Sequence, residues 1–164
     1  MPTTTNIHLK ILFSIFLLSA FFSCENKKEE KTVSHKSSGE ITSVSVSHIG
    51  GILGDYRIIK ATKDSVFAEK GTTANQTHKE WSSAITPDTW KSLISSIHTE
   101  DLDDIKSSPS QQSVDGIDET FQIRTPKKSH IYVNSFADTA HYRQLQMFKE
   151  QLDKILPKEY KEYQ

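Results

Sequence analysis

Two acidic clusters, separated by a short polar stretch, are the first residues in this sequence that could do chemistry. The first cluster is Glu100, Asp101, Asp103 and Asp104, and the second is Asp115, Asp118 and Glu119. A calcium ion takes about six to eight oxygen ligands, which loop carboxylates can supply. The second cluster lacks the alternating acids and the later glutamate of an EF-hand loop. The pattern favours solvated turn residues; Asp115, Asp118 and Glu119 are the only calcium candidates, and no metal site is predicted.

The same three acids are also the residues on which a hydrolase could be built. Glycoside hydrolysis needs two carboxylates facing each other across a cleft. None of the seven histidines stands in an H-x-H, H-E-x-x-H or H-x-x-E-H arrangement, and no G-x-S-x-G nucleophile motif is present. No catalytic residue is therefore predicted, and a hydrolase that uses the loop carboxylates stays open as an alternative.

A glycine-rich stretch, Gly50 to Gly54, could place backbone amides around a phosphate. It lacks the Lys-Ser/Thr of a phosphate-binding loop, and strands are expected on both sides of it. A hairpin connection is the better interpretation. Ile52 and Leu53 at its tip are candidates for a partner contact. Trp81 is either a core residue, which the pattern favours, or a platform for stacking a sugar.

The only cysteine, Cys24, comes directly after an apolar run over residues 11–22 and the small Ser23, and Lys10 precedes the run. A membrane-spanning helix needs about 20 apolar residues, so this run is too short for a stable anchor. It has the length of a signal-peptide core, and a small residue before the break completes the secretory pattern. The sequence therefore predicts a cleaved export signal over residues 1–23.

Residues 21–24, Phe-Phe-Ser-Cys, resemble the lipobox of a bacterial lipoprotein signal peptide, in the more permissive form found in Bacteroidota. The resemblance covers about the first 30 residues and implies that the sulfur of Cys24 carries a diacylglyceryl group. Two or three acyl chains hold a protein firmly on a membrane. The resemblance implies a lipid-anchored protein of the cell envelope, at the outer membrane rather than the inner one.

Composition sets bounds on the chain after the cysteine. Residues 24–39 are nearly all polar and charged, which predicts a flexible tether. Residues 40–164 are enough for one globular domain with a single core. The net charge of −1 excludes the basic excess of nucleic-acid-binding proteins. No cofactor motif is present, and no cofactor is predicted.

The elements that must position any site start with an antiparallel meander. Residues 41–48 alternate, with Val44, Val46 and His48 on one face of a strand. Residues 56–61 and 65–70 predict two further strands around a Thr-Lys-Asp turn. Residues 76–85 predict a fourth strand that carries Trp81.

Two helices and a hairpin complete the predicted fold. Thr86-Pro87 starts a helix that runs to about His98, with an apolar stripe that begins at Trp90. Residues 120–125 and 129–134 form a hairpin. Asp138 is the expected cap of the last helix, which Pro157 ends. The sequence predicts an α+β fold, an antiparallel sheet of five to six strands covered on one face by two helices.

Three function classes remain. The favoured one is a non-enzymatic binding or interaction module, held on the membrane by its lipid and contacting an envelope protein or a glycan. It predicts a small domain with no deep polar pocket. The alternatives are an envelope hydrolase or carbohydrate-active enzyme, and a structural subunit of an envelope assembly.

Overall fold

The computed structural model describes residues 40–161. The predicted signal peptide, Cys24 and the tether lie outside the described residues. Within 40–161, no helix has the length and apolar character needed to cross a bilayer.

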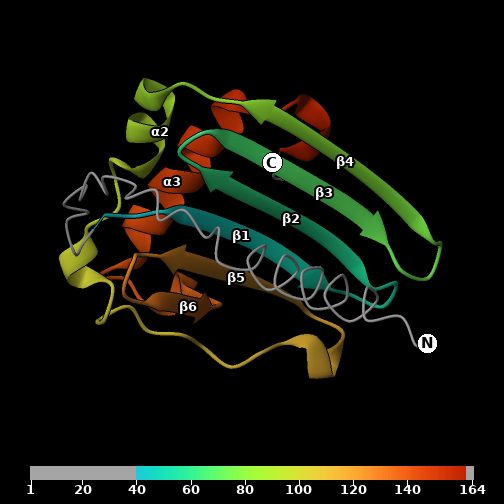
Figure 1. Ribbon diagram of the computed structural model, residues 1–164. Helices are drawn as coiled ribbons and strands as arrows, with labels where there is room; N and C mark the ends of the chain where they lie inside the picture. The colour runs from blue at the N-terminus through green and yellow to red at the C-terminus, as the bar shows by residue number, and fades with distance from the viewer. Residues whose placement is uncertain (1–39, 162–164) are drawn as a thin grey trace, which may run out of the picture. The chain divides into compact units, whose positions relative to one another are not determined.

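One antiparallel sheet contains all six strands, in the spatial order β4-β3-β2-β1-β5-β6 (Figure 1). The strands are β1 (Ser43–Gly50), β2 (Asp55–Thr62), β3 (Ser65–Thr72), β4 (Thr77–Ala84), β5 (Ile117–Arg124) and β6 (Ser129–Val133). The first four strands form the predicted meander, and β5 returns to pair with the other side of β1. The predicted fold class and element order are confirmed.

One face of the sheet supplies the core, and alternation along each strand decides which face it is. Val44 and Val46 of β1 are buried, as are Ile59 of β2 and Phe121 of β5. The apolar stripes of helices α2 (Pro87–Ile94) and α3 (Tyr142–Ile155) pack against them. Both helices therefore cover the same face (Figure 1). Short 3₁₀ turns complete the chain: η1 (Thr99–Asp101), η2 (Gln112–Val114), η3 (Ser135–Ala137) and η4 (Lys158–Tyr160).

Both helices are shorter than predicted. Thr86 caps α2 as expected, accepting a hydrogen bond from the Thr89 amide, but the helix ends at Ile94. The hydroxyl of Ser95 donates to the Ser92 carbonyl at 2.8 Å, a local bond that competes with helix continuation. Asp138 is not the cap of α3, which begins at Tyr142. Its carboxylate instead accepts from the amides of Ala140 and His141 and closes the turn before the helix.

Strand β5 begins at Ile117, three residues earlier than predicted, because the chain already pairs with Gly50 there. This extension places Asp118 and Glu119 inside the sheet. Asp118 Oδ1 accepts from the Gln111 amide at 2.8 Å and from the Asn134 side chain at 2.7 Å. These bonds fasten the connection that precedes β5 to the sheet.

Candidate functional site

A row of charged side chains crosses the core face of the sheet beyond the end of its apolar part. The register pairs His48 with Arg57 on β2 and with Glu119 on β5. Arg57 pairs with Lys70, and Lys70 pairs with Lys79. Neighbouring strands lie about 4.8 Å apart, so the row Lys79, Lys70, Arg57, His48 and Glu119 is continuous across five strands. We call it the charged row.

The middle of the charged row is fixed by hydrogen bonds. Arg57 donates from Nε to the Tyr160 carbonyl at 2.7 Å, and its Nη2 lies 3.6 Å from the carboxylate of Asp153. Its Nη1 lies 3.3 Å from Nδ1 of His48. A guanidinium group only donates, so Nδ1 of His48 accepts and the ring proton lies on Nε2. That nitrogen faces Oε2 of Glu119 at 3.2 Å.

Glu119 is the last residue of the charged row, and hydrogen-bond donors surround its buried carboxylate. Its carboxylate accepts from the hydroxyl of Tyr142 at 2.8 Å and from the ammonium group of Lys149, both on α3. Burial by itself raises the pKa of Glu119, but the hydrogen bonds from His48, Lys149 and Tyr142 and the charge of Lys149 outweigh it and hold the pKa below its usual value. Glu119 is therefore a charged residue that anchors the row.

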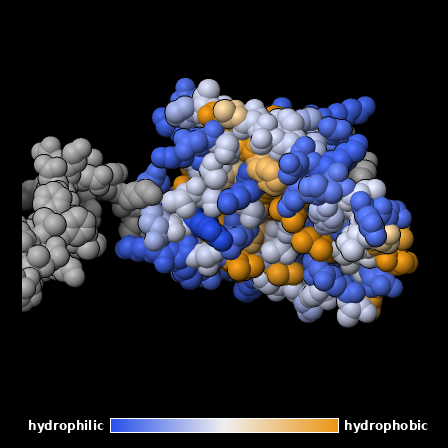
Figure 2. All heavy atoms as spheres, turned by 45° about the vertical axis from the view of Figure 1, so that its right-hand side comes forward, coloured by the Kyte–Doolittle hydropathy of each residue, from blue (hydrophilic) through white to orange (hydrophobic). Residues whose placement is uncertain are grey.

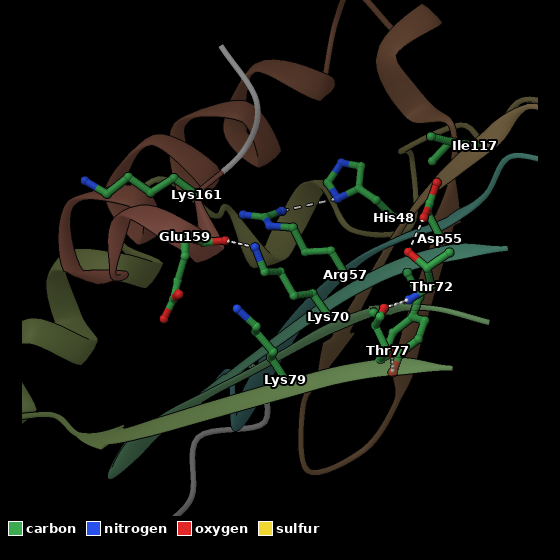
Figure 3. Close-up of a pocket in the computed structure, with 12 residues that line it drawn as sticks. His48, Asp55, Arg57, Lys70, Thr72, Thr77, Lys79, Ile117, Glu159 and Lys161 are labelled. Atoms are coloured by element: carbon green, nitrogen blue, oxygen red, sulfur yellow. Dashed lines mark hydrogen bonds between the residues drawn. The ribbon is translucent and has the colours of Figure 1, made fainter. Parts of the chain in front are cut away.

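A cavity of about 760 Å³ lies over the other end of the charged row. Figure 3 shows the side chains of Arg57, Lys70 and Lys79 rising from the sheet toward it, with Glu159 and Lys161 on the opposite wall. The lining residues are His48, Asp55, Tyr56, Arg57, Lys70, Gly71, Thr72, Thr77, Lys79, Ile117, Glu159 and Lys161. Among these described residues, four Lys or Arg side chains stand against two carboxylates.

The three lysines of the cavity differ in how they are held. The ammonium group of Lys70 donates to the backbone carbonyl of Glu159 and lies 5.5 Å from the ring centre of Tyr160. Within residues 40–161, the ammonium groups of Lys79 and Lys161 have no hydrogen-bond or ion-pair partner. Lys79 and Lys161 therefore line the same cavity, and no fixed carboxylate of these described residues compensates either charge, although the Lys161 side chain extends away from Lys79 (Figure 3).

This arrangement can bind an anion. A carboxylate or phosphate placed between the lysines would accept charge-assisted hydrogen bonds, which are about twice as strong as neutral ones. The carboxylates do not converge: Asp55 is tied to Thr72 Oγ1 at 2.6 Å, and Glu159 lies on the far wall. The cavity thus lacks the paired acids of a hydrolase. A binding module was expected to have no deep polar pocket; this cavity is partly open to solvent, and both charged and apolar surface line it.

The structure does not bring the three acids singled out from the sequence together. Asp118 and Glu119 are adjacent on β5, so their side chains point to opposite faces of the sheet. They are only 6% and 7% exposed, which contradicts the interpretation as solvated turn residues. Hydrogen bonds from the Ser110 hydroxyl and the Gln111 amide lower the pKa of Asp118. Asp115 is exposed, as the turn interpretation predicted.

The first acidic cluster lies on the surface around η1, where Asp103 pairs with Lys128. Among residues 40–161, no group of three or more His, Cys, Asp or Glu side chains is arranged to hold a metal ion.

The candidates for a partner contact separate into two places. Ile52 and Leu53 are exposed in the turn between β1 and β2, where Gly50, Gly51 and Gly54 adopt positive φ as the hairpin interpretation expects. Trp81 is half-buried against the core, with its ring centre 6.4 Å from that of Tyr160. It pairs with Ala68, well along the strand from the end near Ile52.

Sequence reasoning missed the cations of the charged row, although a signal for them is present. Arg57 and Lys70 continue the alternation of buried residues Ile59 and Ala68, so each occupies a position that faces the core. A charged residue at a core-facing position, repeated at the same end of consecutive hairpins, indicates a polar site that the helices do not cover.

Comparison with known proteins adds no assignment to this geometry. No protein-family model matches the chain, and no curated protein matches it significantly.

Proposed function

We propose that this chain is a lipid-anchored binding module of a bacterial cell envelope, and that its cavity binds a ligand through a negatively charged group. The observation that carries the ligand class is that Lys70, Lys79 and Lys161 all line one cavity. The anchor and the envelope location rest on the lipobox-like sequence that ends at Cys24.

The cavity supports binding better than catalysis. A general acid or base must lie within hydrogen-bond reach of the reacting group. Of the two carboxylates that line the cavity, Asp55 is held by Thr72, and Glu159 lies on the opposite wall. Glu119, outside the lining, is held by His48, Lys149 and Tyr142. The cations, in contrast, line the cavity from two sides: Arg57, Lys70 and Lys79 rise from the adjacent strands β2, β3 and β4, and Lys161 follows η4 on the opposite wall.

The direct test is a calorimetric titration with inorganic phosphate. The protein would be residues 24–164 carrying Cys24→Ser, which leaves the tether in place and removes the site of lipidation. Buffer ionic strength would be held constant with NaCl, since surface charge interactions are screened by salt. We expect saturable binding that weakens about tenfold in Lys79→Gln, as the loss of one charge-assisted hydrogen bond predicts.

The matched control is Lys63→Gln, which removes the same charge from the exposed turn between β2 and β3. This variant should bind phosphate as the unmodified chain does. Equal losses in the two variants would show that only net charge matters, and an absence of saturable binding would contradict the proposed anion site.

A further inference from the structure

Four exposed aliphatic side chains lie on two adjacent loops at the end of the sheet next to the cavity. Ile52 and Val114 are 83% and 78% exposed, and Leu53 and Ile117 are about half exposed. We call these four residues the apolar ledge. Figure 2 turns this end of the domain toward the viewer and shows hydrophobic residues at its surface among hydrophilic ones. Clustered exposed aliphatic residues mark binding surfaces more often than scattered ones do.

The apolar ledge comes from two loops that the backbone holds together. The amide of Gly51 donates to the carbonyl of Gly116 at 3.1 Å, and the side chain of Gln112 donates to the carbonyl of Ile49 at 3.2 Å. A Cβ atom at Gly51 would lie 3.8 Å from Cγ1 of Ile117. The turn between β1 and β2 therefore lies directly against the start of β5, and the backbone that carries the ledge is held in place.

The apolar ledge is continuous with the cavity. Ile117 belongs to the ledge and also lines the cavity together with Asp55 and the lysines. Figure 3 shows Ile117 and Asp55 at one end of the cavity and Lys161 and Lys79 toward the other. The carboxylate of Asp55 repels an anion from the Ile117 end. A ligand would place its charged group at the lysine end and could extend past Ile117 over the ledge.

We infer that the ligand is an anionic amphiphile, a lipid-like molecule with an acidic head group. The head group binds at Lys70, Lys79 and Lys161, and the hydrocarbon chain lies against Ile117 and the rest of the apolar ledge. This inference rests on the proposed anion site and adds the class of molecule that carries the anion. Burying the chain gains free energy in proportion to the apolar area removed from water.

The test compares three small probes by calorimetry on the same non-lipidated chain, residues 24–164 with Cys24→Ser. The probes are octyl phosphate below its critical micelle concentration, inorganic phosphate and octyl glucoside. We expect octyl phosphate to bind at least tenfold more tightly than inorganic phosphate, and octyl glucoside to show no saturable binding. Ile117→Ser should remove the tenfold gain.

The matched control is Ile131→Ser, since Ile131 is also more than half exposed but lies on β6, away from the ledge. It should leave the affinity for octyl phosphate unchanged. Val114→Ser, in the exposed η2 turn, repeats the test should Ile117→Ser fail to unfold cooperatively on heating.

Equal affinities for phosphate and octyl phosphate would overturn the amphiphile inference alone. Binding of octyl glucoside as tight as that of octyl phosphate would overturn it too. Failure of both phosphate probes to bind would overturn the anion site itself.

Discussion

The imidazole Nε2 of His48 lies 3.2 Å from Oε2 of Glu119, where the charged row meets the buried donors of α3. Arg57 contacts the opposite ring nitrogen, so the imidazole accepts one hydrogen bond from Arg57 and donates one to Glu119. Glu119 thereby ties the cavity wall to the helix layer. Its carboxylate is the shared acceptor of three side chains.

Replacing this shared acceptor should destabilise the domain strongly. Glu119→Gln removes the charge opposite Lys149 and leaves that ammonium group in a largely buried place. Breaking one partner of a buried ion pair costs about 3 to 5 kcal/mol. Urea unfolding measures the change. The control, Glu80→Gln on exposed β4, should stay within about 0.5 kcal/mol of the unmodified chain. Similar values for the two variants would contradict the role given to Glu119.

Acid should unfold the domain through the same carboxylate and through Asp118. Hydrogen bonds hold the pKa of each below its usual value, which is about 4.3 for glutamate and 3.9 for aspartate. The unfolded chain therefore binds protons more readily than the folded one in this range. The stability they contribute is complete above about pH 5 and is lost as pH falls through the lowered pKa values. Urea midpoints should stay level between pH 6 and pH 5 and fall between pH 5 and pH 3, less steeply in Glu119→Gln. A flat profile would contradict this linkage.

Lys79 should weaken the domain and strengthen ligand binding. It stands directly opposite Lys70 on the neighbouring strand, and like charges in that position are destabilising by roughly 0.2 to 1 kcal/mol. Lys79→Gln is therefore expected to raise the thermal unfolding temperature of the unliganded protein, while 10 mM phosphate raises it less than in the unmodified chain. Lys63→Gln should change neither quantity. A lower unfolding temperature without phosphate would show that Lys79 stabilises the sheet.

Gly50 should not tolerate a side chain. Its φ of +143° is unfavourable for any residue with a Cβ atom, and that atom would clash with the carbonyl oxygen of Gly116. We expect Gly50→Ala to lower the free energy of unfolding by more than about 2 kcal/mol and to weaken octyl phosphate binding, because the two loops of the ledge separate. Ser82→Ala, on exposed β4, is the control. Unchanged stability would mean that the loops can shift without cost.

The lipid anchor has its own test in cells that make the whole chain. Cys24→Ala removes the sulfur that would carry the diacylglyceryl group. We expect loss of radioactive fatty-acid incorporation and release of the protein from the membrane fraction. Ser23→Ala, which keeps a small residue before the cysteine, should still be labelled. Labelling and membrane retention that persist in Cys24→Ala would refute the anchor.

The fold was predictable because short-range patterns determine it. The alternation around Val44 and the stripe that begins at Trp90 identify a strand and a helix without knowledge of their partners. The start of β5 was missed because Ile117 extends the strand only through its pairing with Gly50, a residue far away in sequence. The polar sequence around Ile117, taken alone, does not predict that pairing.

The site was harder to predict than the fold for the same reason. Arg57, Lys70 and Lys79 are unremarkable charged residues until the strand register aligns them. Register depends on turn lengths and on the whole hydrophobic pattern. Ile52 and Leu53 were identified as exposed because two apolar residues between glycines have no strand or helix of their own to bury them.

The central position of β1 also sets the order in which the chain can assemble. Strands β1 to β4 pair with their neighbours in sequence, whereas the contact between His48 and Glu119 joins residues 71 positions apart. Closing such a long loop costs more entropy than forming a hairpin, and non-local pairing slows folding. Pulse-labelled hydrogen exchange should find β2 and β3 protected before β5, and simultaneous protection would refute this order. The meander would therefore bring Arg57, Lys70 and Lys79 together first, and the carboxylate of Glu119 would join them only when β5 pairs with β1.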